Sequence, residues 1–280
     1  MSRTTLVSVA SLAGHLGDPD WIVFDCRHNL QDPDAGQRAY LEGHIPGSRF
    51  LHLDRDLSGA MTGSNGRHPL PDPARFAARL ADLGMRRSMQ AVAYDDAGGA
   101  FAARLWWMLR WLGHERAAIL DGGLQHWTGE GHPLTHAAPV FAPGDFAGTP
   151  VLAPATAAEL LADLDSGGQL ILDARTPERF RGIGETLDPV GGHIPGALNR
   201  FFRDNLDDQG RFRSGAELRR AFAALIGSRD PATVVHQCGS GVTACHNLLA
   251  MELAGLGGSR LYAGSWSEWC ADASRPVARE

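Results

Sequence analysis

Long apolar runs are missing from this sequence of 280 residues. No stretch approaches the roughly 18 apolar residues that a membrane-spanning helix requires. The mildly apolar start, residues 5–10, lacks the basic region, long apolar core and cleavage site of a secretory signal. We therefore expect no membrane association, and we interpret residues 5–10 as a first strand and the start of a helix.

Cysteine is scarce, occurring only at positions 26, 238, 245 and 270, and no two cysteines form a C-x-x-C pair. Their spacing with the twelve histidines matches no zinc signature. The sequence therefore predicts neither a metal site nor a cofactor. A reducing, cytoplasmic setting fits best, because an exposed reactive thiol risks oxidation elsewhere.

Clusters of basic charge are also missing. The 26 basic and 32 acidic residues are interspersed and give a formal net charge of -6. Proteins that bind nucleic acids usually present a basic patch or stripe to the phosphate backbone. We therefore expect no nucleic-acid partner.

An internal repeat is the most extensive feature that is present. Three pairs of segments share a pattern: residues 21–27 with 169–175, 43–47 with 192–196, and 119–123 with 261–265. The second pair reads Gly-His-Ile-Pro-Gly in both copies, and a tryptophan follows each member of the third pair. One ancestral unit has been duplicated, and the chain is long enough for two domains.

Each copy alternates short apolar runs with helical patterns. That alternation favours an α/β fold in which helices flank a mainly parallel sheet. A stretch rich in alanine, proline and glycine without clear periodicity separates the copies and is typical of a linker. We predict a first domain at 1–137, a linker at 138–152 and a second domain at 153–280.

The sequence Cys238-Gly-Ser-Gly-Val-Thr243 follows an apparent buried strand, residues 233–237, and leads into an apolar helix. Successive backbone N–H groups and the positive end of a helix macrodipole converge at such a turn. A thiol there should ionise easily, and the loop should cradle an anion. Cys238 is therefore the candidate nucleophile.

The two copies differ at this loop. Alignment of the preceding strands places Asp96 of the first copy against Cys238 of the second. A carboxylate can stabilise a loop and a helix start, but it cannot take up a sulfur atom. We expect the first copy to be structural and the second to carry the reaction.

These motifs resemble the tandem-domain rhodanese family of sulfurtransferases over essentially the whole chain, with the active copy second. The resemblance implies two rhodanese-like domains. The Cys238 loop looks like that of the 3-mercaptopyruvate sulfurtransferases, whereas thiosulfate-preferring members more often have basic residues just after the cysteine.

The resemblance also implies a ping-pong reaction. Cys238 attacks the sulfur of a small-molecule donor and becomes a persulfide, and an acceptor then removes the outer sulfur. The acceptor would be cyanide or a thiol, such as thioredoxin or a low-molecular-weight thiol. The amides of the loop residues would stabilise the anionic sulfur; these are Gly239, Ser240, Gly241, Val242 and Thr243.

Ser240 and Thr243 each have a further expected role. In mercaptopyruvate enzymes the matching serine works with a histidine and an aspartate of the first domain, and the candidates here are His44 and Asp34. His193 holds the same place in the second copy, so a structural role for His44 stays open. Thr243 would cap the following helix, bond the cysteine sulfur, or do both.

Arg179 resembles the arginine that clamps the donor carboxylate, and a guanidinium suits that planar anion because it donates two parallel hydrogen bonds. Mercaptopyruvate enzymes usually supply a second arginine about nine residues further on, where this chain has Asp188. Arg181 is the candidate substitute. We expect Arg175 to pair with a structural carboxylate, since its counterpart Arg27 lies in the first copy.

Three alternatives remain at this point. The first is a thiosulfate:cyanide sulfurtransferase that uses the same Cys238 chemistry, with Arg179 and Arg181 as an oxyanion site. The second is a sulfur carrier that does not turn over. The third, a phosphatase of rhodanese-like type, is disfavoured because it needs an arginine six positions after the cysteine, where this chain has Ala244.

Overall fold

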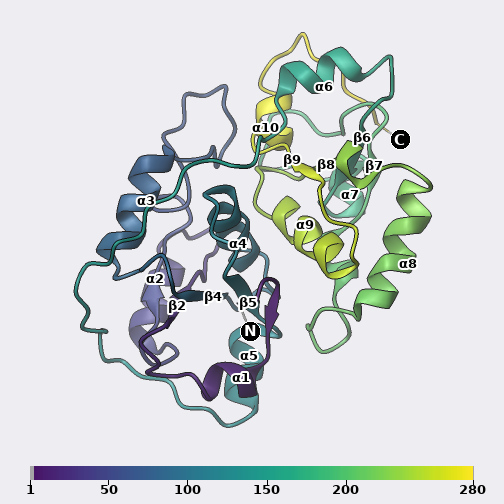
Figure 1. The fold of residues 1–280 in the computed structure, drawn as a ribbon. Helices are drawn as coiled ribbons and strands as arrows, with labels where there is room; N and C mark the ends of the chain where they lie inside the picture. The colour runs from purple at the N-terminus through teal and green to yellow at the C-terminus, as the bar shows by residue number, and fades with distance from the viewer. Residues whose placement is uncertain (1–2, 280) are drawn as a thin grey trace. The chain divides into compact units, whose positions relative to one another are not determined.

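A computed structural model describes residues 3–279, and their contacts divide the chain into two compact units (Figure 1). The first unit holds the residues up to Gly59, Leu70–Leu152 and Asp208–Arg211. The second holds Ala60–Pro69, Ala153–Asp207 and the chain from Phe212 onward. Residues 138–152 belong to the first unit, and the second unit resumes at Ala153.

Each copy lends a short segment to the unit formed by the other copy. The segment at 60–69 comes shortly before α3 (Pro73–Asp82), and the segment at 208–211 comes shortly before α8 (Gly215–Ile226). In both copies, therefore, the segment that is grouped with the other unit comes just before the equivalent helix. Neither exchange is visible in the domain boundaries that composition suggests.

The first unit is built on a five-stranded sheet in which every paired strand is parallel. Across the sheet the order is β1 (Leu6–Val7), β5 (Ala117–Leu120), β4 (Gln90–Tyr94), β2 (Trp21–Asp25) and β3 (Arg49–Phe50). Its helices are α1 (Val9–Ala13), α2 (Ala35–Glu42), α3, α4 (Ala102–Trp111) and α5 (Gly123–Gly129). Side chains of α1 and α5 pack with one face of the strands in a buried cluster, and α4 packs against β4 and β5.

The second unit repeats this plan with four parallel strands. The order is β7 (Leu198–Asn199), β6 (Leu170–Asp173), β8 (Val234–Gln237) and β9 (Arg260–Leu261). Its helices are α6 (Ala157–Asp163), α7 (Pro177–Phe180), α8, α9 (Ala244–Leu253) and α10 (Ser265–Trp269), with short 3-10 turns at Phe202–Asn205 and Pro231–Thr233. The predicted fold, two mainly parallel sheets flanked by helices, is confirmed.

Alternation along the strands explains why helices cover both faces of this sheet. Ile171 and Val235 join a buried cluster with residues of α6, α7 and α10. Their neighbours point to the opposite face, where His236 contacts Phe222 of α8 and Met251 of α9. Strands buried on both faces tend to read as continuous apolar runs, as β5 does; β8 is also fully buried, but only its first two residues are apolar, and His236 and Gln237 are buried polar residues.

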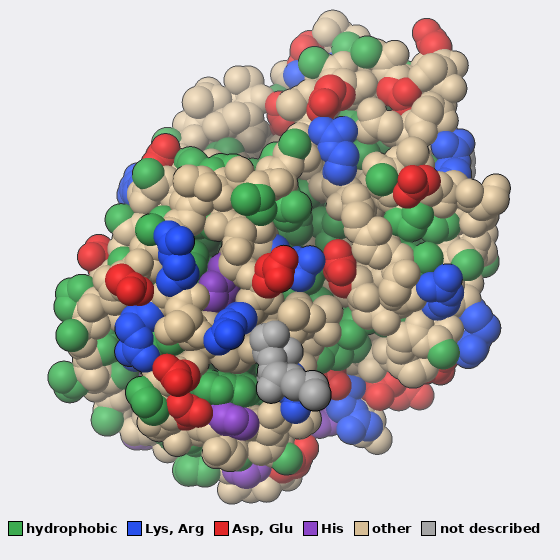
Figure 2. Space-filling model, in the orientation of Figure 1, with side chains coloured by type: hydrophobic (Ala, Val, Ile, Leu, Met, Phe, Trp, Pro, Cys, Tyr) green, Lys and Arg blue, Asp and Glu red, His purple; other side chains and the backbone are tan. Residues whose placement is uncertain are grey.

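Charged side chains of both signs are intermixed with apolar ones over the face shown in Figure 2. The sequence contains no lysine, so all 26 basic residues are arginines. Across residues 3–279, no helix combines the length and the apolar character needed to cross a membrane.

Candidate active site

The Cys238 loop connects the carboxyl end of β8 to α9. Parallel α/β sheets commonly bind ligands at the carboxyl ends of their strands. Cys238 is 2% exposed. Its N–H donates to the hydroxyl of Ser265 at 3.1 Å, and its carbonyl accepts from the Trp266 amide at 3.0 Å. The start of α10 therefore braces the backbone of the candidate nucleophile.

Ser265 holds this brace in a strained conformation. Its φ of +53° is the only positive value at a non-glycine residue within the described chain. Left-handed backbone at such a residue costs of order 1–3 kcal/mol and persists only where surrounding contacts enforce it. The hydrogen bonds to Cys238 and to the Tyr262 carbonyl, the latter at 2.9 Å, supply such contacts.

The loop glycines permit close approaches. Gly241 has a φ of +78°, and a Cβ there would lie 2.2 Å from the carbonyl oxygen of Ala263. A Cβ on Gly239 would lie 2.9 Å from Arg67 Nη2 and 3.3 Å from Arg179 Nη1. Glycine at 241 therefore fits the fold, and glycine at 239 keeps open a space bounded by two guanidinium groups.

The structure corrects the alignment of the two loops by one residue. Asp25 pairs with Tyr94 in the first sheet, and Asp173 pairs with Gln237 in the second. The residue after Tyr94 is Asp95, so Asp95, and not Asp96, is the counterpart of Cys238. The sequence alignment was wrong because two adjacent aspartates follow the strand and a short loop has no periodic pattern to fix its register.

Asp95 shows what the loop amides of this fold can hold. Its carboxylate, which is fully buried, accepts hydrogen bonds from four backbone N–H groups, each at 2.8 Å. The donors are Ala97, Gly99, Phe101 and Ala102. The first copy thus keeps a negative charge in a ring of amides at the position where the second copy has its thiol.

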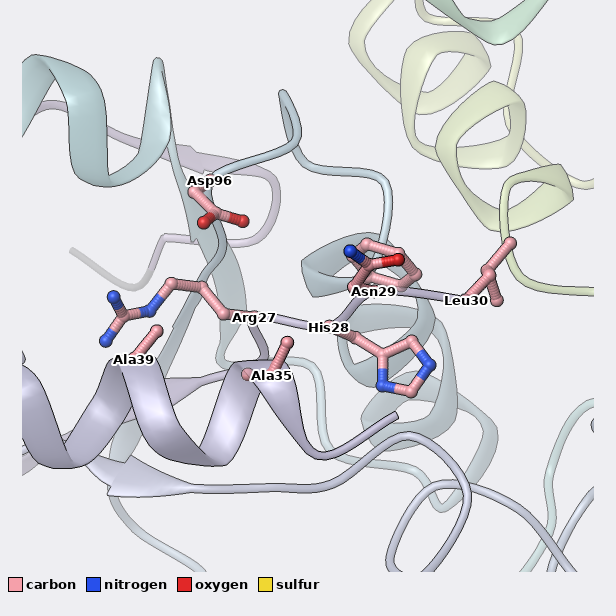
Figure 3. A pocket seen from close by; sticks show the side chains of 9 residues that line it. Arg27, His28, Asn29, Leu30, Ala35, Ala39 and Asp96 are labelled. Carbon is pink, nitrogen blue, oxygen red and sulfur yellow. The ribbon is translucent and has the colours of Figure 1, made fainter. Parts of the chain in front are cut away.

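A cavity of about 490 Å³ lies beside this loop in the first unit (Figure 3). Its lining includes Arg27, His28 and Asp96. Burial, reinforced by Asp95, raises the pKa of the Asp96 carboxyl, and Arg27 opposes this shift. Where Asp96 stands, the second copy has Gly239, so a carboxylate in one copy corresponds to open space in the other.

His44 makes the same contacts in the first copy as His193 makes in the second. Each ring stacks on an aromatic side chain, Tyr40 or Phe180, and each Nδ1 bonds the backbone carbonyl of that same residue, at 2.7 and 2.9 Å. The Nε2 atom of His44 lies 3.2 Å from the Ala137 carbonyl. Both ring nitrogens of His44 therefore serve the packing of its own unit.

Asp34 lies at the opposite end of α2 from His44. It occupies the N-cap of this eight-residue helix, and His44 follows the C-cap. Eight helical residues span about 12 Å, so the structure does not bring the Asp34 carboxylate to the His44 ring. The carboxylate is 57% exposed and forms an ion pair with Arg55.

Ser240 has a different histidine as its partner. Its hydroxyl lies 2.7 Å from Nδ1 of His68, and both residues are 6% exposed. His68 belongs to the segment at 60–69, which is part of the second unit. Sequence reasoning missed His68; the signal was a run of Gly-Arg-His-Pro in a long stretch of the first copy without helical or strand periodicity.

Thr243 occupies the N-cap of α9, but within the described residues its side chain makes no capping hydrogen bond. The predicted cap is therefore not formed. The other expected role, a bond to the cysteine sulfur, stays a prediction.

Arg179 lies beside the loop and is held by two carboxylates. Thr176 caps α7 and Pro177 begins it, which places Arg179 in its single turn. The guanidinium donates to Glu185 from Nε and Nη2, each at 3.0 Å, and its Nη2 lies 3.2 Å from Asp188. Arg181, in contrast, is 46% exposed and lies 3.7 Å from Glu178 in a surface pair.

Arg67 is a second guanidinium at the loop, and the sequence did not point to it. It forms an ion pair with Asp188, whose side chain is only 2% exposed. Its backbone N–H donates to the Ser267 hydroxyl at 3.0 Å. Burial raises the pKa of the Asp188 carboxyl, and Arg67 is the chief opposing influence.

Arg175 pairs with Asp173, as predicted. Its Nη2 donates to Asp173 at 2.6 Å and to the Gly192 carbonyl at 2.7 Å, and Arg27 repeats the arrangement with Asp25 and Gly43. Burial lowers the pKa of Arg175, but Asp173, followed by Glu185 and Cys238, raises it above its usual value. Arg175 is therefore a buried guanidinium whose charge Asp173 balances and which interacts electrostatically with Cys238.

His28, His52 and Asp54 offer potential metal ligands within 4.8 Å of one another in the first unit. The N–H of Asp54, however, donates to Nδ1 of His52 at 3.1 Å. This bond leaves the proton of a neutral ring on Nε2. The cluster is thereby better suited to a hydrogen-bonded turn than to a metal ion.

The geometry agrees with the comparisons with known proteins. The rhodanese-like domain family matches residues 8–130 and 156–272. A protein of Pseudomonas aeruginosa named "Probable 3-mercaptopyruvate sulfurtransferase" is 50% identical over 99% of both chains. The thiosulfate sulfurtransferase of Bos taurus is 34% identical over 92% of this chain and 87% of its own.

Among solved structures, the 3-mercaptopyruvate sulfurtransferase SseA of Escherichia coli superimposes with a TM-score of 0.82 at 32% identity, covering 94% of this chain and 99% of its own. Two parallel sheets, each ending in a loop that holds an anion or a cysteine, define a protein of tandem rhodanese type. The chain belongs to the rhodanese family.

Proposed function

We propose that this chain is a sulfurtransferase that moves a sulfur atom from 3-mercaptopyruvate to a thiol or to cyanide through a persulfide on Cys238. The observation that carries the proposal is the carboxylate of Asp95 in the equivalent loop. Its oxygens are two bonds from Cβ, as the outer sulfur of a cysteine persulfide is. The amide ring that holds this carboxylate therefore has the size and polarity to hold an anionic persulfide.

The first half-reaction forms an S–S bond and breaks a C–S bond. The Cys238 thiolate attacks the donor sulfur, and the C–S electron pair passes to the carbon fragment, which leaves as the enolate of pyruvate. That enolate takes up the proton of the donor's thiol group to give pyruvate. The outer sulfur stays on Cys238 as the persulfide anion, stabilised by the loop amides and by the positive charge of Arg175.

Ser240 acts with His68 in this step. Negative charge develops on the donor's carbonyl oxygen as the enolate forms, and a hydroxyl positioned by a histidine is suited to stabilise it. The 2.7 Å bond between Ser240 and His68 supports this pair. The pair replaces the Ser240–His44–Asp34 relay, because His44 is engaged by backbone carbonyls.

Arg179 binds the donor carboxylate. Glu185 and Asp188 fix its guanidinium beside Gly239, next to the nucleophile. In the second half-reaction an acceptor thiolate or cyanide attacks the outer sulfur, the S–S bond breaks, and the Cys238 thiolate is regenerated. All four cysteines are free, which supports a reducing, cytoplasmic location and thiol acceptors such as thioredoxin or a low-molecular-weight thiol.

Thiosulfate is the second candidate donor. Two guanidinium groups near Gly239 favour it, since a dianion gains from two positive partners. The Cys238 chemistry would be the same, with sulfite as the leaving group. A carrier that accepts sulfur without turning over is the remaining alternative.

Sulfur transfer to cyanide, with 3-mercaptopyruvate and thiosulfate compared side by side, tests the proposal. We expect turnover with a preference for 3-mercaptopyruvate, and a mass increase of one sulfur atom on the Cys238 peptide before the acceptor is added. Cys238→Ser should abolish both. Transfer that survives Cys238→Ser would overturn the mechanism, and a single stoichiometric loading without turnover would favour the carrier.

A further inference from the structure

Two guanidinium groups from distant parts of the sequence converge on the residue that follows the nucleophile. The position of a Cβ on Gly239 lies 2.9 Å from Arg67 Nη2 and 3.3 Å from Arg179 Nη1. Both arginine side chains keep partial access to solvent, with exposures of 27% and 23%. Two cationic groups are therefore presented at one open point of the loop.

Asp188 holds both groups by its two oxygens. Its Oδ1 pairs with Nη1 of Arg67, and its Oδ2 lies 3.2 Å from Nη2 of Arg179. Glu185 accepts hydrogen bonds from Nε and Nη2 of Arg179. The carboxylates thus engage Nη1 of Arg67 and the Nε and Nη2 atoms of Arg179. The two nitrogens nearest to the Cβ position on Gly239 are Arg67 Nη2 and Arg179 Nη1, and Arg179 Nη2 follows at 3.6 Å.

The backbone around Arg67 is fixed on the second unit. Its N–H bonds the Ser267 hydroxyl at 3.0 Å. The preceding Gly66 has a φ of +83°, and a Cβ there would lie 2.6 Å from the Gly264 carbonyl oxygen. These close backbone contacts fix the position of Arg67, and a residue that binds a small ligand needs such a fixed position.

We propose that Arg67 is a second donor-binding residue, and that Arg67 Nη2 and Arg179 Nη1 together bind the carboxylate of 3-mercaptopyruvate, with Asp188 holding the two groups in place. This inference rests on the proposed function. Consecutive Cα atoms are about 3.8 Å apart, so a carboxylate bound over Gly239 is separated from the Cys238 sulfur by a distance that a three-carbon keto acid can bridge.

The position of Arg67 includes a contact that a purely structural role does not require. To neutralise the buried Asp188, the Nη1 atom of Arg67 is sufficient. The approach of Nη2 to Gly239 adds nothing to that ion pair, yet it places a charged donor beside the nucleophile. Asp188 stands where the family resemblance led us to expect an arginine, and Arg67 supplies that positive charge from another segment.

Kinetics of Arg67→Ala test this role. Loss of a charge-assisted hydrogen bond costs about 1.5–3 kcal/mol, so we expect KM for 3-mercaptopyruvate to rise about ten- to a hundredfold with a smaller change in kcat. The Kd of hydroxypyruvate, which has no sulfur to give, should rise by a similar factor when measured by calorimetry on Cys238→Ser protein. The control is Arg229→Ala, an arginine that bonds backbone carbonyls at 167 and 168.

A double variant separates ligand binding from charge compensation. Arg67→Ala leaves Asp188 without its main counter-charge, and this alone could repel the donor. Arg67→Ala combined with Asp188→Asn removes that repulsion. A KM that stays high in the double variant supports Arg67 as a ligand of the donor, whereas a KM that returns to that of Asp188→Asn alone would overturn the role.

Failure of this inference can be told apart from failure of the proposed function. An unaltered protein that transfers no sulfur from 3-mercaptopyruvate would refute the function itself. An unaltered protein that is active, together with an Arg67→Ala variant of unchanged KM and unchanged hydroxypyruvate affinity, would refute only the role of Arg67.

Discussion

The two loops that end the central strands, one in each copy, start at equivalent positions but differ in length and in their first side chain. Helix α4 begins at Ala102, seven residues after Asp95, whereas α9 begins at Ala244, six residues after Cys238. In the first copy Asp95 fills a ring of four amides with its own carboxylate. In the second copy the same position holds Cys238. Gly98 and Gly241, three residues further on, have φ values of +72° and +78°.

The comparison shows that a loop of this fold can bind a negatively charged group at the end of the central strand in a copy that has no cysteine there. In the first loop the negative charge is part of the Asp95 side chain, so the amides have an acceptor without any bound ligand. In the proposed mechanism, the cysteine leaves room at this position for the sulfur that it would receive. The two copies thus keep the strand that leads into the loop and a positive φ at Gly98 and Gly241, while the loop length and several of its side chains differ.

Converting the second loop into a copy of the first should have the largest effect. Cys238→Asp removes the nucleophile, and we expect sulfur transfer to fall by about 10⁴-fold or more. The new carboxylate should accept hydrogen bonds from backbone amides of its own loop, as Asp95 does in the first copy. We therefore expect no fall in the free energy of unfolding. Urea denaturation, with Cys238→Ser for comparison, measures this; a strongly destabilised Cys238→Asp protein would contradict the equivalence of the loops.

Removal of the carboxylate from the first loop should destabilise the first unit. Asp95→Ala leaves four N–H donors without their acceptor, and we expect a loss of about 3 kcal/mol or more in the free energy of unfolding. Asp96→Ala is the matched control and should cost less than about 1 kcal/mol. If Asp96→Ala were the more damaging change, the corrected alignment would be wrong.

Ser240 provides a further contrast between the copies, because Ala97 stands at its position in the first loop. We expect Ser240→Ala and His68→Gln each to lower kcat by about 10²-fold, the lower end of the range for general acid–base assistance. Ala97→Ser should leave sulfur transfer unchanged. Full activity in both Ser240→Ala and His68→Gln would remove the pair from the mechanism.

His236 should give the second unit a pH dependence that the first lacks, since Ala93 occupies the equivalent place. Burial lowers the pKa of His236 to about 3. Between this value and about 6.5, the unfolded chain binds a proton that the folded protein does not, so stability falls as pH falls. The loss should be about 1.4 kcal/mol per pH unit between pH 6 and 4.

The pH profile of unfolding by urea measures this slope. His236→Gln should flatten it by the contribution of one group, whatever the absolute stability of the variant. An unchanged slope in His236→Gln would show that other groups account for the acid sensitivity.

The sequence predicted those parts of the fold that depend on local patterns. Alternating apolar runs and the duplicated segments were enough to establish two parallel sheets. Cys238 could be proposed because its glycine-bearing loop lies between a buried strand and a helix, and Arg179 because its segment resembles the one that binds the donor in the family. Arg175 could be paired with a carboxylate because Arg27 repeats it in the copy without a nucleophile.

Other parts of the site depend on contacts that no local pattern encodes. Arg67 and His68 precede the loop by some 170 residues of sequence and reach it only because their segment joins the second unit. The His-Ile-Pro-Gly repeat drew attention to His44, although its conservation between the two copies reflects packing that both copies share. The position of Asp95 needed the register of the sheet, which a short loop does not reveal.

The exchange of segments makes the second unit depend on residues from the first half of the chain. The second unit takes residues 60–69 from the first half of the chain, including the histidine that bonds Ser240. A gene truncated to its catalytic half would encode Cys238 but not Arg67 or His68. With the roles proposed for Arg67 and His68, deletion of the first copy would remove two residues of the site as well as a domain, and the remaining half would need replacements for both.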